Sequence, residues 1–192
     1  TCSRKQLQGN GACYPGNCRG RILRPDGDAA IRVHTPDREI IIDDALQGRF
    51  RQQIGVDTGD FVIKRKEGFY AYHLAVVIDD AEQGITHIVR GIDLLDSTPA
   101  HRLLQQWLGL PTPHYAHLPV IINDDGQKLS KQTFASALRP ESASEQLLQV
   151  LSLLGQQPPA SLAKATPREI LAWAVSHWEL SRIPAQRDLR LH

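Results

Sequence analysis

Strand-like and helix-like segments alternate between residues 85 and 122, and this alternation constrains the fold more than any other feature. The run THIVRG, residues 86–91, predicts a short strand, and HLPVII, residues 117–122, predicts a second, buried one. A helix is expected between them over residues 97–109, where Ser97 or Thr98 caps the start and Pro99 stands near its first position. Strands that alternate with helices indicate an α/β fold.

Shorter patterns flank this unit. Strand-like runs at residues 29–33, 38–43 and 60–65, separated by turns, predict a small β-rich insert. The apolar run at residues 72–80 fits either a strand or a buried helix. Two amphipathic helices are expected near the C-terminus, each with a capping box, Ser142 to Glu145 and Thr166 to Glu169.

Composition and strand content bear on whether the chain contains a whole domain. The 192 residues are 41% hydrophobic and carry a net charge of +1, so nothing global demands a nucleic acid or a membrane. No window approaches the roughly 18 apolar residues of a membrane span. The α/β part holds two or three strands, too few for a doubly wound sheet, and the chain opens with Thr1 and contains no methionine. We therefore expect a fragment whose sheet is completed by preceding sequence.

The cysteines all lie near the N-terminus. Cys2, Cys13 and Cys18 form an odd, clustered set, which is a poor disulfide framework and fits a reducing compartment. Zinc needs about four ligands, and only three thiols are present, although the Pro-Gly turn of YPGNC could bring Tyr14 close to Cys18. Spacing alone leaves a metal site and incidental thiols equally open.

A lysine-rich loop, GQKLSKQ at residues 126–132, follows the second strand. Lys128 and Lys131 bracket Ser130, and Gly126 gives the segment flexibility. Taken alone, the pattern fits a charged, solvated hairpin tip. Lysines on a mobile loop also suit the charge that develops during reactions of phosphates, because lysine is a point charge on a flexible stem.

These segments together resemble the class I glutamyl-tRNA synthetases. The resemblance rests on ITHIVRGIDLLDSTPAHRLLQQWLGLPTPHYAHLPVI, on the KLSKQ loop as a variant of the KMSKS loop, and on AYHLAVVIDD as the glutamate-pocket segment. It implies the second half of a Rossmann-like catalytic domain over residues 67–135. A zinc-binding β insert over residues 1–66 and a helical subdomain over 136–192 would flank it. The HIGH-like motif is expected upstream, so this fragment alone should be inactive.

The fit is closer to the truncated paralogues of that family, the glutamyl-Q tRNA(Asp) synthetases. Only 61 residues follow Lys131, which leaves no room for anticodon-binding domains. Cys2, Tyr14 and Cys18 match the family's structural zinc ligands, with the remaining ligand expected before Thr1 or replaced by Cys13. The resemblance implies activation of L-glutamate with ATP and Mg²⁺, then transfer to the queuosine at the wobble position of tRNA(Asp). We expect a cytoplasmic monomer that does not engage a membrane.

The same resemblance assigns roles to single residues. Lys131 would contact the ATP phosphates with Lys128 assisting as the second catalytic lysine, while Arg90 and Tyr72 would bind glutamate. The guanidinium of Arg90 suits a carboxylate, and burying it without a partner would be costly. For Tyr72 the alternative is simple packing. For Arg90 the alternative is a structural salt bridge with one of three acids, Asp79, Asp80 or Asp93.

Other interpretations stay open. The chain could charge tRNA(Glu), or it could be a zinc-bearing RNA-binding module without catalysis. Five basic residues near the cysteines fit either contact with an RNA backbone or a solvated face: Arg4, Lys5, Arg19, Arg21 and Arg24. The histidines, including His73, His114 and His117, show no metal-binding spacing and are interpreted as ordinary polar residues.

Overall fold

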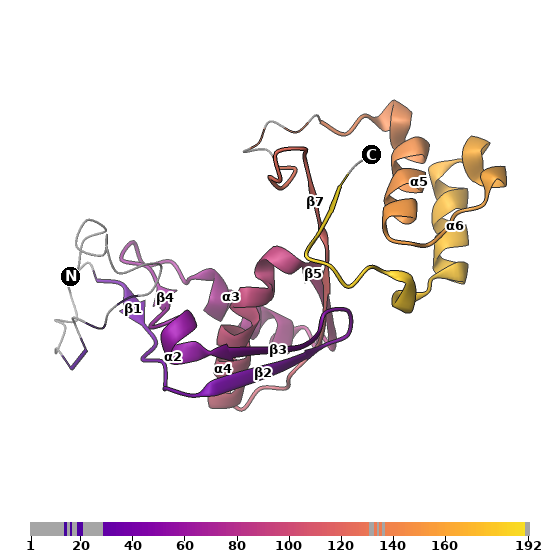
Figure 1. Cartoon of the computed structure of the whole chain (residues 1–192). Helices are drawn as coiled ribbons and strands as arrows, with labels where there is room; N and C mark the ends of the chain where they lie inside the picture. Colours follow the sequence, from indigo (N-terminus) through magenta and orange to yellow (C-terminus); the bar gives the residue numbers. More distant parts are fainter. Residues whose placement is uncertain are drawn as a thin grey trace. The chain divides into compact units, whose positions relative to one another are not determined.

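The computed structural model describes Tyr14, Gly16, residues 19–20 and 29–130, Thr133, Ala135 and residues 137–190. The chain forms two compact units (Figure 1). The first comprises Thr1–Ile88 and Leu94–Tyr115, and the second comprises Val89–Asp93 and Ala116–His192. The expected division into segments 1–66, 67–135 and 136–192 stays a prediction.

A four-stranded sheet has the order β3-β2-β6-β5, which are Gly48–Gln53, Glu39–Asp44, His114–Leu118 and His87–Gly91. Strands β2 and β3 form an antiparallel hairpin, whereas β2 runs parallel to β6 with Asp44 opposite Tyr115. Strand β2 alternates strictly, so Ile40 and Ile42 are buried and Ile41 is exposed. The mixed α/β character expected from the sequence is confirmed.

Two helices build the core of the first unit. The run at 72–80 is helical: α3 covers Tyr72–Glu82, and α4 covers Thr98–Leu108. Helix α4 packs on β2 and on α3. Its buried side chains Leu103 and Leu104 meet Val77 of α3 in one hydrophobic cluster with the isoleucines of β2. The helix ends at Gly109, which has a left-handed φ of 65°.

Two of the three strands predicted for the insert, those over 29–33 and 60–65, are shorter than expected. Strand β1, Ile31–Arg32, pairs antiparallel with β4, Val62–Lys64, and a short helix α2, Ile54–Asp57, follows β3. Ile63 of β4 packs against the cluster that contains the α4 leucines, and Phe61, just before β4, is buried in it. Among the described residues, this small two-stranded sheet therefore rests on the core of the first unit.

The predicted strand over 117–122 is two strands in the structure. Strand β6 ends at Leu118 and β7 covers Val120–Ile122, with Pro119 between them. Proline has no N–H to give to a strand ladder, so pairing changes at this position. Strand β7 pairs in parallel with β8, Asp188–Arg190, which the sequence patterns did not predict.

The two C-terminal helices are α5, Ala143–Leu153, and α6, Pro167–His177. The capping box of α6 is confirmed, with Thr166 and Glu169 bonded in both directions. The capping box of α5 is wrong, because Ser142 makes no side-chain capping bond. It closes a 3₁₀ turn, η3, Pro140–Ser142, so its backbone lacks the extended conformation that an N-cap requires.

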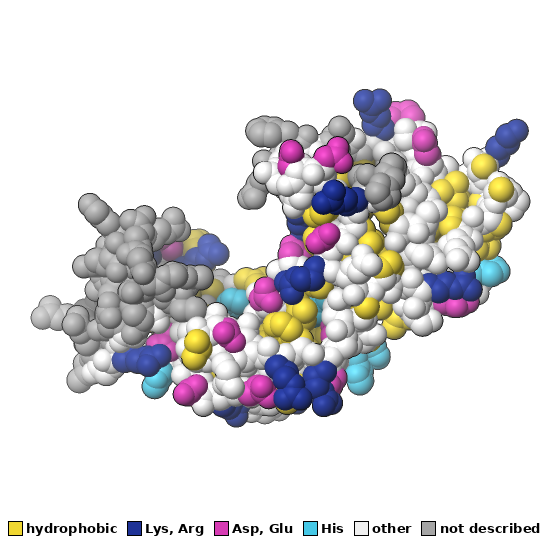
Figure 2. All heavy atoms as spheres, viewed as in Figure 1, with side chains coloured by type: hydrophobic (Ala, Val, Ile, Leu, Met, Phe, Trp, Pro, Cys, Tyr) yellow, Lys and Arg dark blue, Asp and Glu magenta, His cyan; other side chains and the backbone are white. Residues whose placement is uncertain are grey.

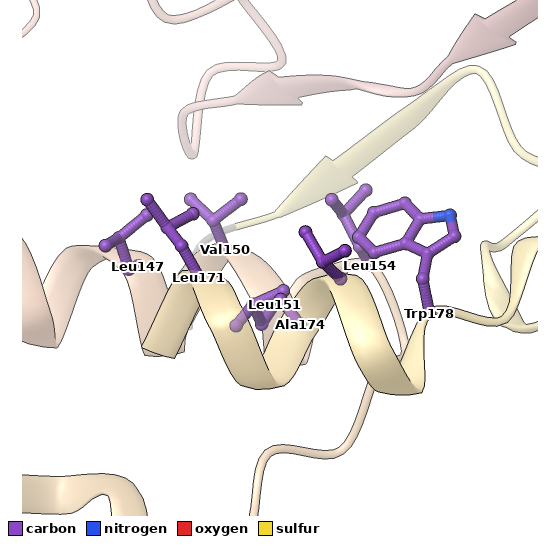
Figure 3. Close-up of a pocket in the computed structure, with 8 residues that line it drawn as sticks. Leu147, Val150, Leu151, Leu154, Leu171, Ala174 and Trp178 are labelled. Carbon is purple, nitrogen blue, oxygen red and sulfur yellow. The ribbon is translucent and has the colours of Figure 1, made fainter. Parts of the chain in front are cut away.

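Helices α5 and α6 pack through Leu151, Ile170 and Ala174, which are buried. An open apolar groove of about 480 Å³ lies beside this contact, between α5 and α6 (Figure 3). Hydrophobic side chains also remain visible at the surface over these helices in Figure 2. The short 3₁₀ turns η4, Ala160–Lys164, and η5, Leu180–Arg182, complete the segment. Among the described residues, no helix is long and apolar enough to cross a membrane.

Candidate active site

Arg90 lies one residue before the end of β5 and is half-buried. Its Nε donates a hydrogen bond of 3.0 Å to Nε2 of His117, which comes from β6 and is fully buried. An imidazole nitrogen accepts only when it carries no proton, so this bond requires a neutral His117 with its proton on Nδ1. His117 therefore holds the guanidinium through its Nε.

The lysine loop begins as a tight turn that extends β7. Asn123 and Gln127 close the turn through a backbone bond of 2.9 Å, and the Gln127 N–H also donates to Asn123 Oδ1 at 2.8 Å. Gly126 has a φ of 75°, and nothing lies within 4 Å of a Cβ at this position. The glycine is therefore required by backbone conformation and not by space. Lys128 then pairs with Ile122 in an antiparallel bridge.

The Lys128 side chain reaches the segment that follows β5. Its Nζ lies 2.6 Å from Oδ2 of Asp93, in the 3₁₀ helix η1, Ile92–Ser97. Both side chains are substantially exposed, 48% for Lys128 and 42% for Asp93. The cation of the loop is thus held three residues beyond Arg90.

Gly91 separates these two contacts in the chain. A Cβ at Gly91 would collide with the Oδ1 atom of Asp93 and would also contact Val120. The absence of a side chain lets the Asp93 carboxylate fold back over the end of β5, where it meets Lys128. The RG-x-D order of the sequence therefore places both cations at one strand end.

Tyr72 is the first residue of α3, belongs to the first unit and is 44% exposed. Its ring meets the ring of His101 edge-on, with centroids 5.5 Å apart. His73 Nδ1 and His101 Nε2 lie 3.1 Å apart, and His101 is almost fully buried. One of the two imidazoles must donate to the other, so this pair fixes the surface against which Tyr72 rests.

Several predicted site residues lie outside the described part of the chain: Lys131, Cys2 and Cys18. Of the expected zinc ligands, Tyr14 is described, and the guanidinium of Arg32 stacks 4.5 Å from its ring centroid. Thiolates suit tetrahedral Zn²⁺ chemically. Within the described ranges, no group of three or more His, Cys, Asp or Glu side chains could hold a metal ion.

Arg19, one of the basic residues near the cysteines, is engaged by Asp60. Its Nε and Nη2 donate to the two carboxylate oxygens at 2.8 Å each. The backbone and hydroxyl of Thr35 also donate to Asp60, which is 3% exposed. Burial raises the pKa of Asp60, but the hydrogen bonds from Arg19 and Thr35 outweigh burial and leave the pKa below its ordinary value. The charge of Arg19 is therefore largely neutralised by a structural partner.

Comparison with known proteins identifies the class. A family model described as tRNA synthetases class I (E and Q), catalytic domain, matches residues 20–176. The chain therefore belongs to the class I tRNA synthetase family for glutamate and glutamine. Among solved structures, a glutamate tRNA ligase from Elizabethkingia meningosepticum, crystallised with its amino acid, is similar with a TM-score of 0.62 and 27% identity. The match covers 85% of this chain and 36% of that one.

The curated relatives are more specific. Proteins named glutamyl-Q tRNA(Asp) synthetase are 51% identical in Ectopseudomonas mendocina, 53% in Pseudomonas aeruginosa and 50% in Methylococcus capsulatus. These matches cover 98%, 96% and 98% of this chain. The chain spans 64%, 62% and 63% of the length of these relatives. The relationship read from the KLSKQ loop and its neighbours is thereby confirmed.

The sequence patterns do not predict the partners of the two cations. They indicate an ordinary polar residue at His117, and they offer Asp93 only as a possible partner of Arg90. The missed signal was the alternation in HYAHL, residues 114–118, which places His117 on the same face as buried Tyr115. A buried histidine beside an arginine-bearing strand needs a partner.

Proposed function

We propose that the complete gene product containing this chain activates L-glutamate with ATP and transfers it to the queuosine at the wobble position of tRNA(Asp). The observation that carries this proposal is a pair of contacts at the end of β5. There Arg90 is oriented by His117, and Asp93, three residues on, binds Lys128 of the KLSKQ loop. Family membership supports the reaction class, and the names of the curated relatives support the acceptor.

Glutamate has two carboxylates, and the reaction uses them differently. In the proposal Arg90 binds one carboxylate and the Tyr72 hydroxyl contacts the amino acid. The other carboxylate attacks the α-phosphorus of Mg²⁺-bound ATP, an oxygen–phosphorus bond forms, and pyrophosphate leaves. Lys128 and Lys131 stabilise the negative charge that develops on the phosphates, and one such donor is typically worth about 2.7–4 kcal/mol. The acceptor then attacks the activated carbonyl carbon, and AMP leaves.

Zinc has a structural role in this proposal. Cys2, Tyr14 and Cys18 would supply ligands of a closed site within segment 1–66 of the chain. Such a site stabilises a small insert because binding energy becomes folding energy. Elemental analysis of the purified gene product should find zinc, and Cys18→Ser should lower both zinc content and melting temperature. Full zinc content in the Cys18→Ser variant would contradict this ligand assignment.

The acceptor is tested with radiolabelled glutamate, ATP, and tRNA(Asp) with and without queuosine. We expect label on the queuosine-bearing tRNA only. Equal labelling of both samples, or labelling of tRNA(Glu) instead, would refute the acceptor.

A second candidate is a glutamyl-tRNA synthetase that charges tRNA(Glu), since one similar solved structure is a glutamate tRNA ligase. Periodate treatment of the tRNA before the assay would oxidise the 3′ terminal ribose and block attachment at that end. The queuosine must itself escape oxidation, so it is either protected during the treatment or introduced after it. If queuosine is the acceptor, glutamate should still label this tRNA. Loss of all labelling under these conditions would favour the 3′ end as acceptor.

A non-catalytic RNA-binding module makes a different prediction. Exchange of labelled pyrophosphate into ATP requires reversible formation of an adenylate. We expect exchange that depends on glutamate and is not supported by aspartate. A complete gene product that binds tRNA but shows no exchange would favour the module.

A further inference from the structure

A short hairpin links β4 to α3 in the first unit. Lys64 pairs antiparallel with Tyr70, the Arg65 N–H donates to the Phe69 carbonyl at 2.8 Å, and the Gly68 N–H donates to the Arg65 carbonyl at 3.0 Å. Gly68 has a φ of 91°, which only glycine adopts readily. These bonds define residues 64–70 as an ordered hairpin, called here the 64–70 hairpin.

The 64–70 hairpin exposes its aromatic side chains. Phe69 is 71% exposed and Tyr70 is 65% exposed. Tyr70 pairs with Lys64 across the hairpin, so the side chains of these two residues share one face. On the Tyr70 face, Nζ of Lys64 lies 5.7 Å from the ring centroid. These rings contribute little to the core and are available at the surface.

The charge of the hairpin is mainly positive. The hairpin carries one acidic residue, Glu67, and three basic residues, Lys64, Arg65 and Lys66. The Glu67 carboxylate lies 3.9 Å from the Nζ of Lys66. Exposed rings beside cations match the two recognition elements of an unpaired nucleotide, a flat base and a phosphate. A purely apolar protein partner would leave these cations desolvated and unpaired, which is unfavourable.

The position of the hairpin adds a functional argument. Tyr70 is two residues before Tyr72, the proposed glutamate contact, so at most about 7 Å of extended chain separates their Cα atoms. An acceptor nucleotide must approach the activated glutamate closely for transfer to occur. A nucleotide stacked on Tyr70 would therefore lie close to Tyr72 along the chain.

We propose that the 64–70 hairpin binds unpaired nucleotides of the acceptor tRNA loop, with a base stacked on Tyr70 and a phosphate held by Lys64. This inference rests on the proposed function for its acceptor. It goes further by assigning a surface that places the tRNA loop beside Tyr72, the proposed glutamate contact in the same unit.

The first test compares Tyr70→Ala with Tyr70→Trp in the complete gene product. Stacking on one base is worth roughly 5- to 150-fold in affinity, so Tyr70→Ala should raise KM for queuosine-bearing tRNA(Asp) by that factor. Tyr70→Trp retains a ring and should stay near the wild-type value. Glutamate-dependent pyrophosphate exchange without tRNA should be unchanged in both. Trp107→Ala removes a comparably exposed ring of α4, 51% exposed, and should leave KM for tRNA unaltered.

The second test measures binding of tRNA(Asp) against salt concentration. Each phosphate contact to a single strand contributes about 0.7 to the slope of log K against log[salt]. Lys64→Ala should lower the slope by about that amount. Lys164→Ala, an exposed lysine of η4, should not change it.

Three results would overturn the inference. They are an unchanged KM for tRNA in Tyr70→Ala, an equal loss of pyrophosphate exchange, or a lower melting temperature, which would show that the ring packs against protein. Failure of the proposed function looks different, because wild-type protein would then show no glutamate-dependent exchange. Direct binding of tRNA(Asp) would still report on the hairpin in that case.

Discussion

Arg90 and Lys128 are both cations of the second unit, but the protein holds them in opposite ways. Arg90 is half-buried and donates to a fully buried imidazole, whereas Lys128 is 48% exposed and pairs with an exposed carboxylate. A buried, hydrogen-bonded contact fixes a side chain, while an exposed ion pair is weak and exchanges partners easily. In the proposed reaction, the amino acid therefore meets a fixed cation and the phosphates meet a mobile one.

The largest effect is expected from Arg90→Ala, which removes the fixed cation. Truncation of one partner in a buried charged pair typically costs about 2–5 kcal/mol, or roughly 30- to 5,000-fold in kcat/KM for glutamate. Glutamate-dependent pyrophosphate exchange measures this loss. Arg49→Ala is the matched control, because Arg49 forms an exposed ion pair with Asp43 on the β2–β3 hairpin. An Arg90→Ala enzyme with wild-type kcat/KM would remove Arg90 from the site.

His117→Phe tests whether the fixed state of Arg90 depends on its acceptor. A donor left unsatisfied in a buried site costs about 1–3 kcal/mol, so KM for glutamate should rise by roughly 5- to 150-fold. His117→Gln supplies an amide oxygen near the position of Nε2 and should recover part of the loss. Gln156→Leu removes another buried polar side chain of the second unit and should leave this KM unchanged. Failure of His117→Gln to outperform His117→Phe would argue for packing alone.

The ion pair of Asp60 combines the two kinds of contact compared above. Its carboxylate is buried, whereas its partner Arg19 is 46% exposed. Its pKa is lowered in the folded state, so its stabilisation is complete above the unfolded pKa of about 3.9 and is lost as pH falls through the folded pKa. Asp60→Asn should cost about 1–3 kcal/mol at neutral pH and little at low pH. Chemical unfolding at several pH values measures the difference. A cost that does not shrink in acid would show that hydrogen bonds, and not charge, dominate.

The α4 helix, β2 and β5 could be predicted because each carries a strong local signal, such as Pro99 near the first turn of α4. Strand β3 was missed because GRFRQQ contains one large apolar residue and is stabilised by its pairing with β2. Strand β8 was missed for the same reason, since DLR acquires strand structure by pairing with β7. Local patterns contain no information about such partners.

In the candidate site, too, local patterns reveal single residues but not their partners. Arg90 and the lysine loop could be identified because each lies in a recognisable segment. Their partners could not, because Arg90 and His117 are 27 residues apart and Asp93 and Lys128 are 35 residues apart. Pairing over these separations depends on how β5, β6 and β7 are placed, and this arrangement depends on the change of pairing at Pro119.

The smallest effect is expected from Asp93→Asn, which releases the mobile cation. Exposed ion pairs contribute about 0–1 kcal/mol, so stability should change little. The ATP phosphates must displace Asp93 from Lys128, so this substitution should lower KM for ATP by up to about fivefold. KM for glutamate should stay constant, and the change should shrink at high salt because screening weakens exposed pairs. Glu179→Gln breaks another exposed pair of the second unit, with Arg182, and should leave KM for ATP unaltered. A rise in KM for ATP in Asp93→Asn would mean that Asp93 orients Lys128 toward the phosphates, and the lysine would then be as fixed as the arginine.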